Sequence, residues 1–145
     1  MNTISAVAGI LAAAALALAG CSSGSTPEPV DVTGTQTQCV GGETDTGFTA
    51  DCVMTVSDER LSGSIAVDFD KVSDGPPVAF EGTAVITNGG GTWTGDCTGT
   101  LDEETDFSSF DCDYVGAGDF AGLRYTGHAE GTGTPSEVSG TITAQ

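Results

Sequence analysis

Apolar and polar residues alternate along most of this chain with a period of two. Such alternation is typical of β-strands that bury one face and expose the other. Apolar residues or glycine take alternate positions in segments 50–56, 65–69, 80–86, 93–101, 110–114, 123–129 and 138–144. With a first strand around Cys39, the pattern predicts an all-β domain of about eight strands.

Short, turn-forming sequences separate these segments. Residues 88–91 read Asn-Gly-Gly-Gly, a strong hairpin signal because Asn and Gly tolerate positive φ. Residues 74–77, 116–119 and 131–135 are also rich in Gly, Pro or Asp, and no segment keeps a helical period for three turns. We therefore expect neighbouring strands to pair as an antiparallel meander.

Glycine recurs on the inward face of the predicted strands. The positions are Gly63, Gly82, Gly95, Gly99, Gly127 and Gly140. Glycine weakens a flat strand, so its recurrence indicates tight bending or close packing of aromatic neighbours. Eight bent strands can close into a small barrel without exposed edges, which is the predicted architecture. A two-sheet β-sandwich is the alternative.

The N-terminus carries a targeting sequence. Residues 4–19 are almost entirely Ala, Leu, Ile and Val, about the length of a signal-peptide core. They end in Leu18-Ala19-Gly20-Cys21, which resembles the cleavage and acylation site of bacterial lipoproteins. The resemblance implies a signal peptide at 1–20, a lipidated Cys21 on a flexible tether at 21–35, and a barrel domain at 36–145. The apolar run lacks a preceding Lys or Arg, which departs from the usual basic start of such a sequence. The alternative is an ordinary signal peptide that ends near a Cys, or a short anchor helix.

The charge balance excludes one class of partner. The chain has 21 acidic and 3 strongly basic residues, for a formal net charge of −18. Phosphate backbones would be repelled, so we expect no nucleic-acid binding. Among the rare cations, Arg60 and Arg124 are expected to pair with neighbouring carboxylates rather than to bind an anionic ligand.

Four cysteines remain in the domain if Cys21 is acylated. Cys39 and Cys52 flank one turn-rich loop, and Cys97 and Cys112 flank another. Each pair can face across a hairpin, which favours the disulfides Cys39–Cys52 and Cys97–Cys112. Disulfides agree with an exported protein. Zinc binding is the competing interpretation, but the chain lacks the CxxC spacing of zinc sites.

A second resemblance lies within the predicted barrel. Residues 116–123 read Gly-Ala-Gly-Asp-Phe-Ala-Gly-Leu and resemble a turn of the allene oxide cyclase and dirigent-like barrels. Segments 57–63 and 91–95 resemble, in the same order, motifs of uncharacterised secreted bacterial proteins with such barrels. The resemblance covers about residues 50–145 and implies the barrel fold. No residues map onto the catalytic positions of the plant enzymes.

Aromatic side chains are the candidates for lining a ligand cavity. The candidates are Phe69, Phe80, Trp93, Phe110, Tyr114, Phe120 and Tyr125. They would surround an apolar ligand if the barrel interior is open. The competing expectation is a filled core, because an eight-stranded barrel is just wide enough for side chains to fill.

Polar side chains suggest little chemistry. The acidic loop 102–106 is a hypothetical weak Ca²⁺ site, although it lacks an EF-hand pattern. Asp68, Asp70, Asp111 and Asp113 fall on the outward face, where solvation is a simpler role than glycoside hydrolysis. His128, the only histidine, also falls on that face. We expect no metal and no cofactor.

These observations lead to three functional hypotheses. The first is a non-enzymatic, lipid-anchored envelope protein with a structural or interaction role, its partners being the membrane and another envelope protein. The second is a barrel that binds a small apolar ligand. The third is an enzyme, which is the weakest because no catalytic constellation is visible.

Overall fold

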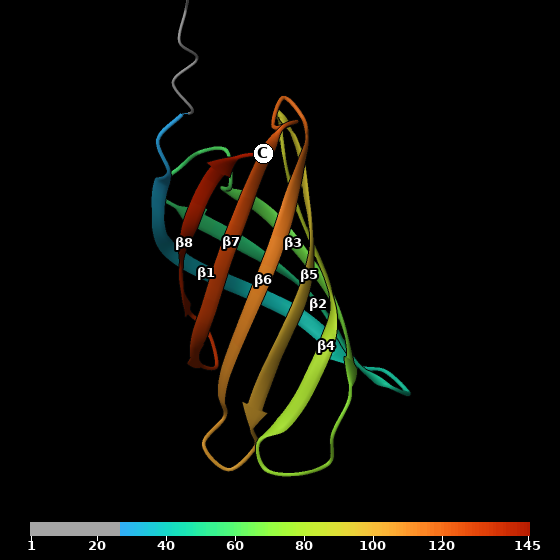
Figure 1. Cartoon of the computed structure of the whole chain (residues 1–145). Coiled ribbons are helices and arrows are strands. Elements are labelled where there is room, and N and C mark those ends of the chain that lie inside the picture. The colour runs from blue at the N-terminus through green and yellow to red at the C-terminus, as the bar shows by residue number, and fades with distance from the viewer. Residues whose placement is uncertain (1–26) are drawn as a thin grey trace, which may run out of the picture.

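The computed structural model describes residues 27–145, which form a closed antiparallel β-barrel (Figure 1). The strands are β1 (Val30–Glu43), β2 (Gly47–Val56), β3 (Gly63–Lys71), β4 (Val78–Asn88), β5 (Gly91–Asp102), β6 (Phe107–Gly118), β7 (Leu123–Thr132) and β8 (Ser136–Ala144). Each strand pairs with the next in sequence, and β8 pairs with β1. The predicted eight-stranded meander barrel is confirmed, and the sandwich alternative is wrong.

The first strand begins earlier than expected. Strand β1 starts at Val30, so residues 30–35 belong to the barrel and not to the tether assigned to 21–35. Val32 is buried and pairs with Gly140 of β8, which closes the barrel. The error has a simple cause: between Val30 and Gln36 only Val32 places a large apolar side chain inward, so the segment looks like a polar linker. The signal peptide 1–20 and Cys21 lie outside the described residues.

A bulge in β1 brings Cys39 to the inside of the barrel. Thr37 pairs with Val53 and Val40 with Asp51, so β1 has one extra residue opposite β2 at this point. Gln38 within the bulge adopts a φ of 53°, in the left-handed region. The bulge changes which alternate positions of β1 face inward, as bulges do when they disturb the ladder. Cys39 therefore faces Cys52 across the two strands.

Both expected disulfides are present. Cys39 bonds to Cys52, and Cys97 bonds to Cys112. The second pair occupies directly opposed positions of β5 and β6. Disulfides persist in oxidising compartments, so these two bonds indicate an extracytoplasmic protein. Within residues 27–145, we find no helix with the length and apolar character needed to cross a membrane.

Aromatic rings lie directly over inward-facing glycines. A Cβ atom at Gly95 would stand only 2.5 Å from Cδ1 of Tyr114. Cβ atoms at Gly127 and Gly140 would stand 2.6 and 2.5 Å from ring atoms of Tyr125. Larger residues at these positions would displace the rings. The expectation that inward glycines accommodate aromatic neighbours is confirmed.

One end of the barrel is plugged by side chains and loops. Trp93 and Leu61 are fully buried there, and Phe120 stacks on Trp93 with ring centroids 5.3 Å apart. The indole Nε1 of Trp93 donates a hydrogen bond to the backbone carbonyl of Arg60, at 2.8 Å. Asn88 Nδ2 donates to the same carbonyl, also at 2.8 Å. The β2–β3 and β6–β7 loops thus close this end.

Candidate functional site

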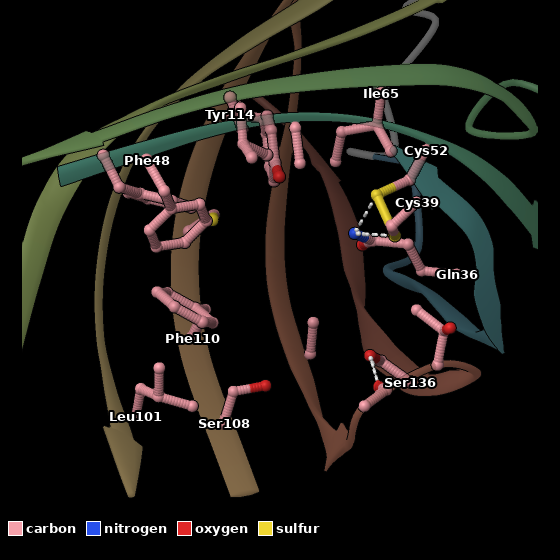
Figure 2. Close-up of a pocket in the computed structure, with 18 residues that line it drawn as sticks. Gln36, Cys39, Phe48, Cys52, Ile65, Leu101, Ser108, Phe110, Tyr114 and Ser136 are labelled. Carbon is pink, nitrogen blue, oxygen red and sulfur yellow. Dashed lines mark hydrogen bonds between the residues drawn. A yellow bond between two sulfur atoms is a disulfide. The ribbon is translucent and has the colours of Figure 1, made fainter. Parts of the chain in front are cut away.

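The interior of the barrel contains an apolar cavity of about 260 Å³ (Figure 2). Side chains or backbone atoms from every strand, and from the turn between β7 and β8, line it. Gly133 and Thr134 of that turn are exposed, so the cavity reaches the surface at the end opposite the Trp93 plug. The lining is Gln36, Cys39, Phe48, Ala50, Cys52, Ile65, Val67, Phe69, Ala84, Leu101, Ser108, Phe110, Cys112, Tyr114, Ala129, Gly133, Thr134 and Ser136.

Aromatic side chains form one wall of the cavity. Phe69 and Phe110 stack with their ring centroids 4.8 Å apart and an interplanar angle of 21°. Phe48 lies 5.3 Å from Phe69 and 6.3 Å from Phe110, in tilted and edge-to-face arrangements. Such pairs hold each other in place, because the ring quadrupoles favour these geometries. The wall is a preformed apolar surface.

The opposite wall consists of the Cys39–Cys52 disulfide, whose sulfur atoms are polarisable, and the side-chain amide of Gln36. Figure 2 shows Gln36 and the Cys39–Cys52 disulfide facing Phe48 and Phe110 across the cavity. Gln36 Nε2 donates to Cys52 Sγ at 3.1 Å and more weakly to Cys39 Sγ at 3.6 Å. These contacts hold the amide of Gln36 beside the disulfide and orient it in the cavity.

The structure divides the predicted cavity residues into two groups. Phe69, Phe110 and Tyr114 line the cavity, as expected. Phe80 is buried behind Phe48, with ring centroids 5.1 Å apart, and does not reach the cavity.

Three more candidates fill the closed end of the barrel instead of lining the cavity. Trp93 and Phe120 form the plug, and Tyr125 packs between Trp93 and Tyr114. The strand pattern shows that a residue points inward, but not how far along the barrel axis it lies. The filled core that the sequence analysis expected is therefore found at the Trp93 end of the barrel, and the open cavity is found at the other end.

Two important lining residues were missed. Phe48 lies two positions before Ala50, on the same inward face, so an earlier start of that strand would have identified it. Gln36 lies in the first strand, and the sequence offered no signal for it because a polar side chain is unexpected inside a barrel. It faces inward because Val32, Gly34 and Gln36 occupy alternate positions before the bulge.

The cavity presents no charged side chain. Its lining contains no Asp, Glu, Lys, Arg or His, and its cysteines are oxidised. Its one phenol, Tyr114, has its pKa raised by burial, with a smaller contribution from Tyr125. Burial also raises the pKa of Tyr125 to about 12. Both phenols are neutral near pH 7, so the lining is suited to an uncharged ligand.

The residues that carry charge near pH 7 lie outside the cavity. Arg60 pairs with Asp58 at 2.6 Å, and Arg124 pairs with Asp113, which confirms the expected pairing of both arginines with carboxylates. Hydrogen bonds from these arginines lower the pKa of each carboxyl.

His128 lies on the outer face with two acidic neighbours. Its Nδ1 lies 2.8 Å from Asp111 Oδ1, and its Nε2 lies 3.4 Å from Glu130 Oε2. The hydrogen bond with Asp111 raises the pKa of His128, and Glu130 adds to the effect.

Among residues 27–145, no group of three or more His, Cys, Asp or Glu is arranged to hold a metal ion.

Comparisons with protein-family models, curated proteins and solved structures find no match to this chain. The fold and the cavity are therefore the basis for proposing a function.

Proposed function

We propose that this protein is an exported barrel that binds a small, mostly apolar molecule in its interior. The observation that carries the proposal is the preformed cavity of about 260 Å³, whose lining is mainly aromatic and aliphatic. Ligand sites are typically concave and apolar, with a few placed polar groups. The cavity is the reason for placing ligand binding ahead of a purely structural or interaction role.

The size of the cavity restricts the ligand. A cavity of roughly 150 Å³ holds benzene, and drug-sized ligands occupy about 300–1,000 Å³. At about 260 Å³, the site suits one or two fused rings or a short branched chain. A long acyl chain does not fit within it.

The cavity mouth lies at the end of the barrel opposite the start of β1. Strand β1 begins near the plugged end, where Ser57 N donates to Thr33 O at 2.8 Å. The mouth lies at the other end, where Gly133 N donates to Asp106 O at 3.3 Å between two turns. A ligand would therefore enter at the end of the barrel away from the start of β1.

We propose further that Cys21 anchors the barrel to a membrane through a lipid. The lipoprotein-like sequence ending at Cys21 and the short segment before Val30 support this attachment. Fatty-acid labelling of the expressed protein tests it: we expect label in the wild type and none in Cys21→Ser. Equal labelling of both proteins contradicts the anchor. Residues 116–123 resemble a turn of allene oxide cyclase and dirigent-like barrels. We propose a relationship to those barrels in fold only, and we do not extend their activity to this chain.

Binding of 1-naphthylamine, an uncharged two-ring probe whose short-wavelength emission increases in apolar sites, tests ligand binding. We expect saturable enhancement with the wild-type protein. Ala129→Leu extends an inward side chain into the cavity, so it should weaken binding at least about tenfold, equivalent to 1.4 kcal/mol. Ala66→Leu adds the same atoms to the outer face of β3 and should bind like the wild type.

Two results would contradict ligand binding in this cavity. One is the absence of saturable probe binding by the folded wild-type protein. The other is equal weakening by Ala129→Leu and Ala66→Leu, because binding would then depend on the outer surface or on stability. Circular dichroism of each variant establishes that the barrel is intact.

A further inference from the structure

We infer that the ligand is an uncharged aromatic molecule that carries one hydrogen-bond donor, and that this donor meets Oε1 of Gln36. The inference rests on the proposed function and specifies its ligand class. The ring would lie against the wall formed by Phe48, Phe69 and Phe110. Its donor would point across the cavity toward β1, where Gln36 faces that wall (Figure 2).

The hydrogen bonding of Gln36 leaves one atom available. Its Nε2 already donates to the sulfur atoms of the Cys39–Cys52 disulfide. Its Oε1 accepts no hydrogen bond from the residues that the structure describes. No buried side-chain nitrogen or oxygen among those residues lacks a partner, so Oε1 is in contact with accessible space. Because Gln36 lines the cavity, a ligand donor can reach this acceptor.

Ser108 and Ser136, two other polar residues of the lining, are engaged at the rim. Ser108 Oγ donates to the carbonyl of Gly131 at 3.4 Å, and Ser136 Oγ donates to that of Gly133 at 3.1 Å. Both serines lie toward the mouth, whereas Gln36 is beside the disulfide, deeper in the cavity. Leaving an acceptor unpaired against an apolar ligand is unfavourable, so a donor at this position adds selectivity.

Charge excludes an anionic ligand. No Lys, Arg or His lines the cavity, and the three strong bases each pair with an Asp on the outside. A carboxylate would therefore be buried without a cation, in a protein with a formal net charge of −18. Neutral phenols, indoles and aromatic amines combine an aromatic ring, which can pack on the phenylalanine wall, with a hydrogen-bond donor for Gln36.

A matched pair of probes tests the inference. 2-Naphthol and 2-methylnaphthalene have the same ring and similar size, but only the first has a donor. We measure the ratio of their affinities by displacement of 1-naphthylamine. We then compare this ratio between the wild type and each variant, because the comparison cancels the difference in hydrophobicity between the two probes. Replacing the amide in Gln36→Met should shift this ratio against 2-naphthol by about three- to tenfold. Gln38→Met, which makes the same change at an exposed position of the bulge, should leave the ratio as in the wild type.

The Gln36 side-chain amide resonances of the wild-type protein give a second measurement that needs no variant. We expect 2-naphthol to shift them more than 2-methylnaphthalene does. If both probes bind but neither the ratio nor the resonances respond as expected, the inference is overturned and the proposed function stands. If neither probe binds the wild-type protein, the proposed function fails as well.

Discussion

The indole nitrogen of Trp93 hydrogen-bonds to the backbone carbonyl of Arg60, which lies 33 residues earlier in the chain. This bond fastens the β2–β3 loop across one end of the barrel. Asn88 supports it by donating to the same carbonyl, and Phe120 covers the indole ring. The plug leaves the cavity open at the opposite end, which is where the proposed ligand would enter.

Trp93→Phe should destabilise the barrel by about 1–3 kcal/mol, measured by urea unfolding followed by circular dichroism. The change removes the donor to Arg60 and part of a fully buried ring, while Asn88 still satisfies the carbonyl. Val115→Ala, at an outward position, should stay within about 0.5 kcal/mol of the wild type. A loss no larger than that of Val115→Ala would show that the plug contributes little.

Gly95→Ala should destabilise the protein by about 1–3 kcal/mol, because the new methyl group overlaps the ring of Tyr114. Thermal unfolding measures the effect. Gly75 in the β3–β4 loop is the control, since a Cβ atom there meets nothing within 4 Å. Gly75→Ala should be neutral or slightly stabilising. Equal behaviour of the two variants would contradict the close approach of Gly95 and Tyr114.

Replacing Cys97 and Cys112 together by Ala should lower stability by about 3 kcal/mol, or roughly 10 °C in Tm. The bond closes a loop with a sequence separation of 15, and its loss restores freedom to the unfolded chain. The reduced wild-type protein should lose at least as much, because both disulfides are then open. A Tm that is unchanged by reduction would contradict this role.

Tyrosinate absorbance should appear only as the barrel unfolds at high pH. Burial raises the pKa of Tyr125 to about 12 and that of Tyr114 further still, from an ordinary value of 10.0. The folded state therefore holds these protons more tightly, and its stability falls as the pH rises above 10. The chain has only two tyrosines, so the signal is unambiguous. Ionisation near pH 10 with an intact circular dichroism spectrum would contradict their burial.

The single histidine should titrate above its ordinary pKa of 6.5, which NMR can follow directly. Asp111 favours the protonated ring of His128, so the stabilisation is complete below pH 6.5 and is lost as the pH rises through the folded-state pKa. The pair is exposed, so the effect is at most about 1 kcal/mol. Asp111→Asn should lower the pKa of His128; the same pKa in both proteins would assign the shift to another cause.

Several features of the site followed from local pattern alone. Alternation identified the inward positions of Phe69, Phe110 and Tyr114, because side chains on a strand repeat with a period of two. Turn chemistry predicted the meander, and the spacing of cysteines across hairpins predicted both disulfides. The outward placement of Arg124 and of His128 followed from the same alternation.

The sequence by itself therefore determined the strands, their order, the inward faces and the cysteine pairs, since each depends on residues close together in the chain. Only the tertiary structure decided which end of the barrel is filled and which is open. That division depends on the height of each side chain along the barrel axis, which the register of all eight strands sets. The bulge at Gln38 and the placement of Gln36 opposite the phenylalanines also depend on pairing between distant segments, so no local pattern could reveal them.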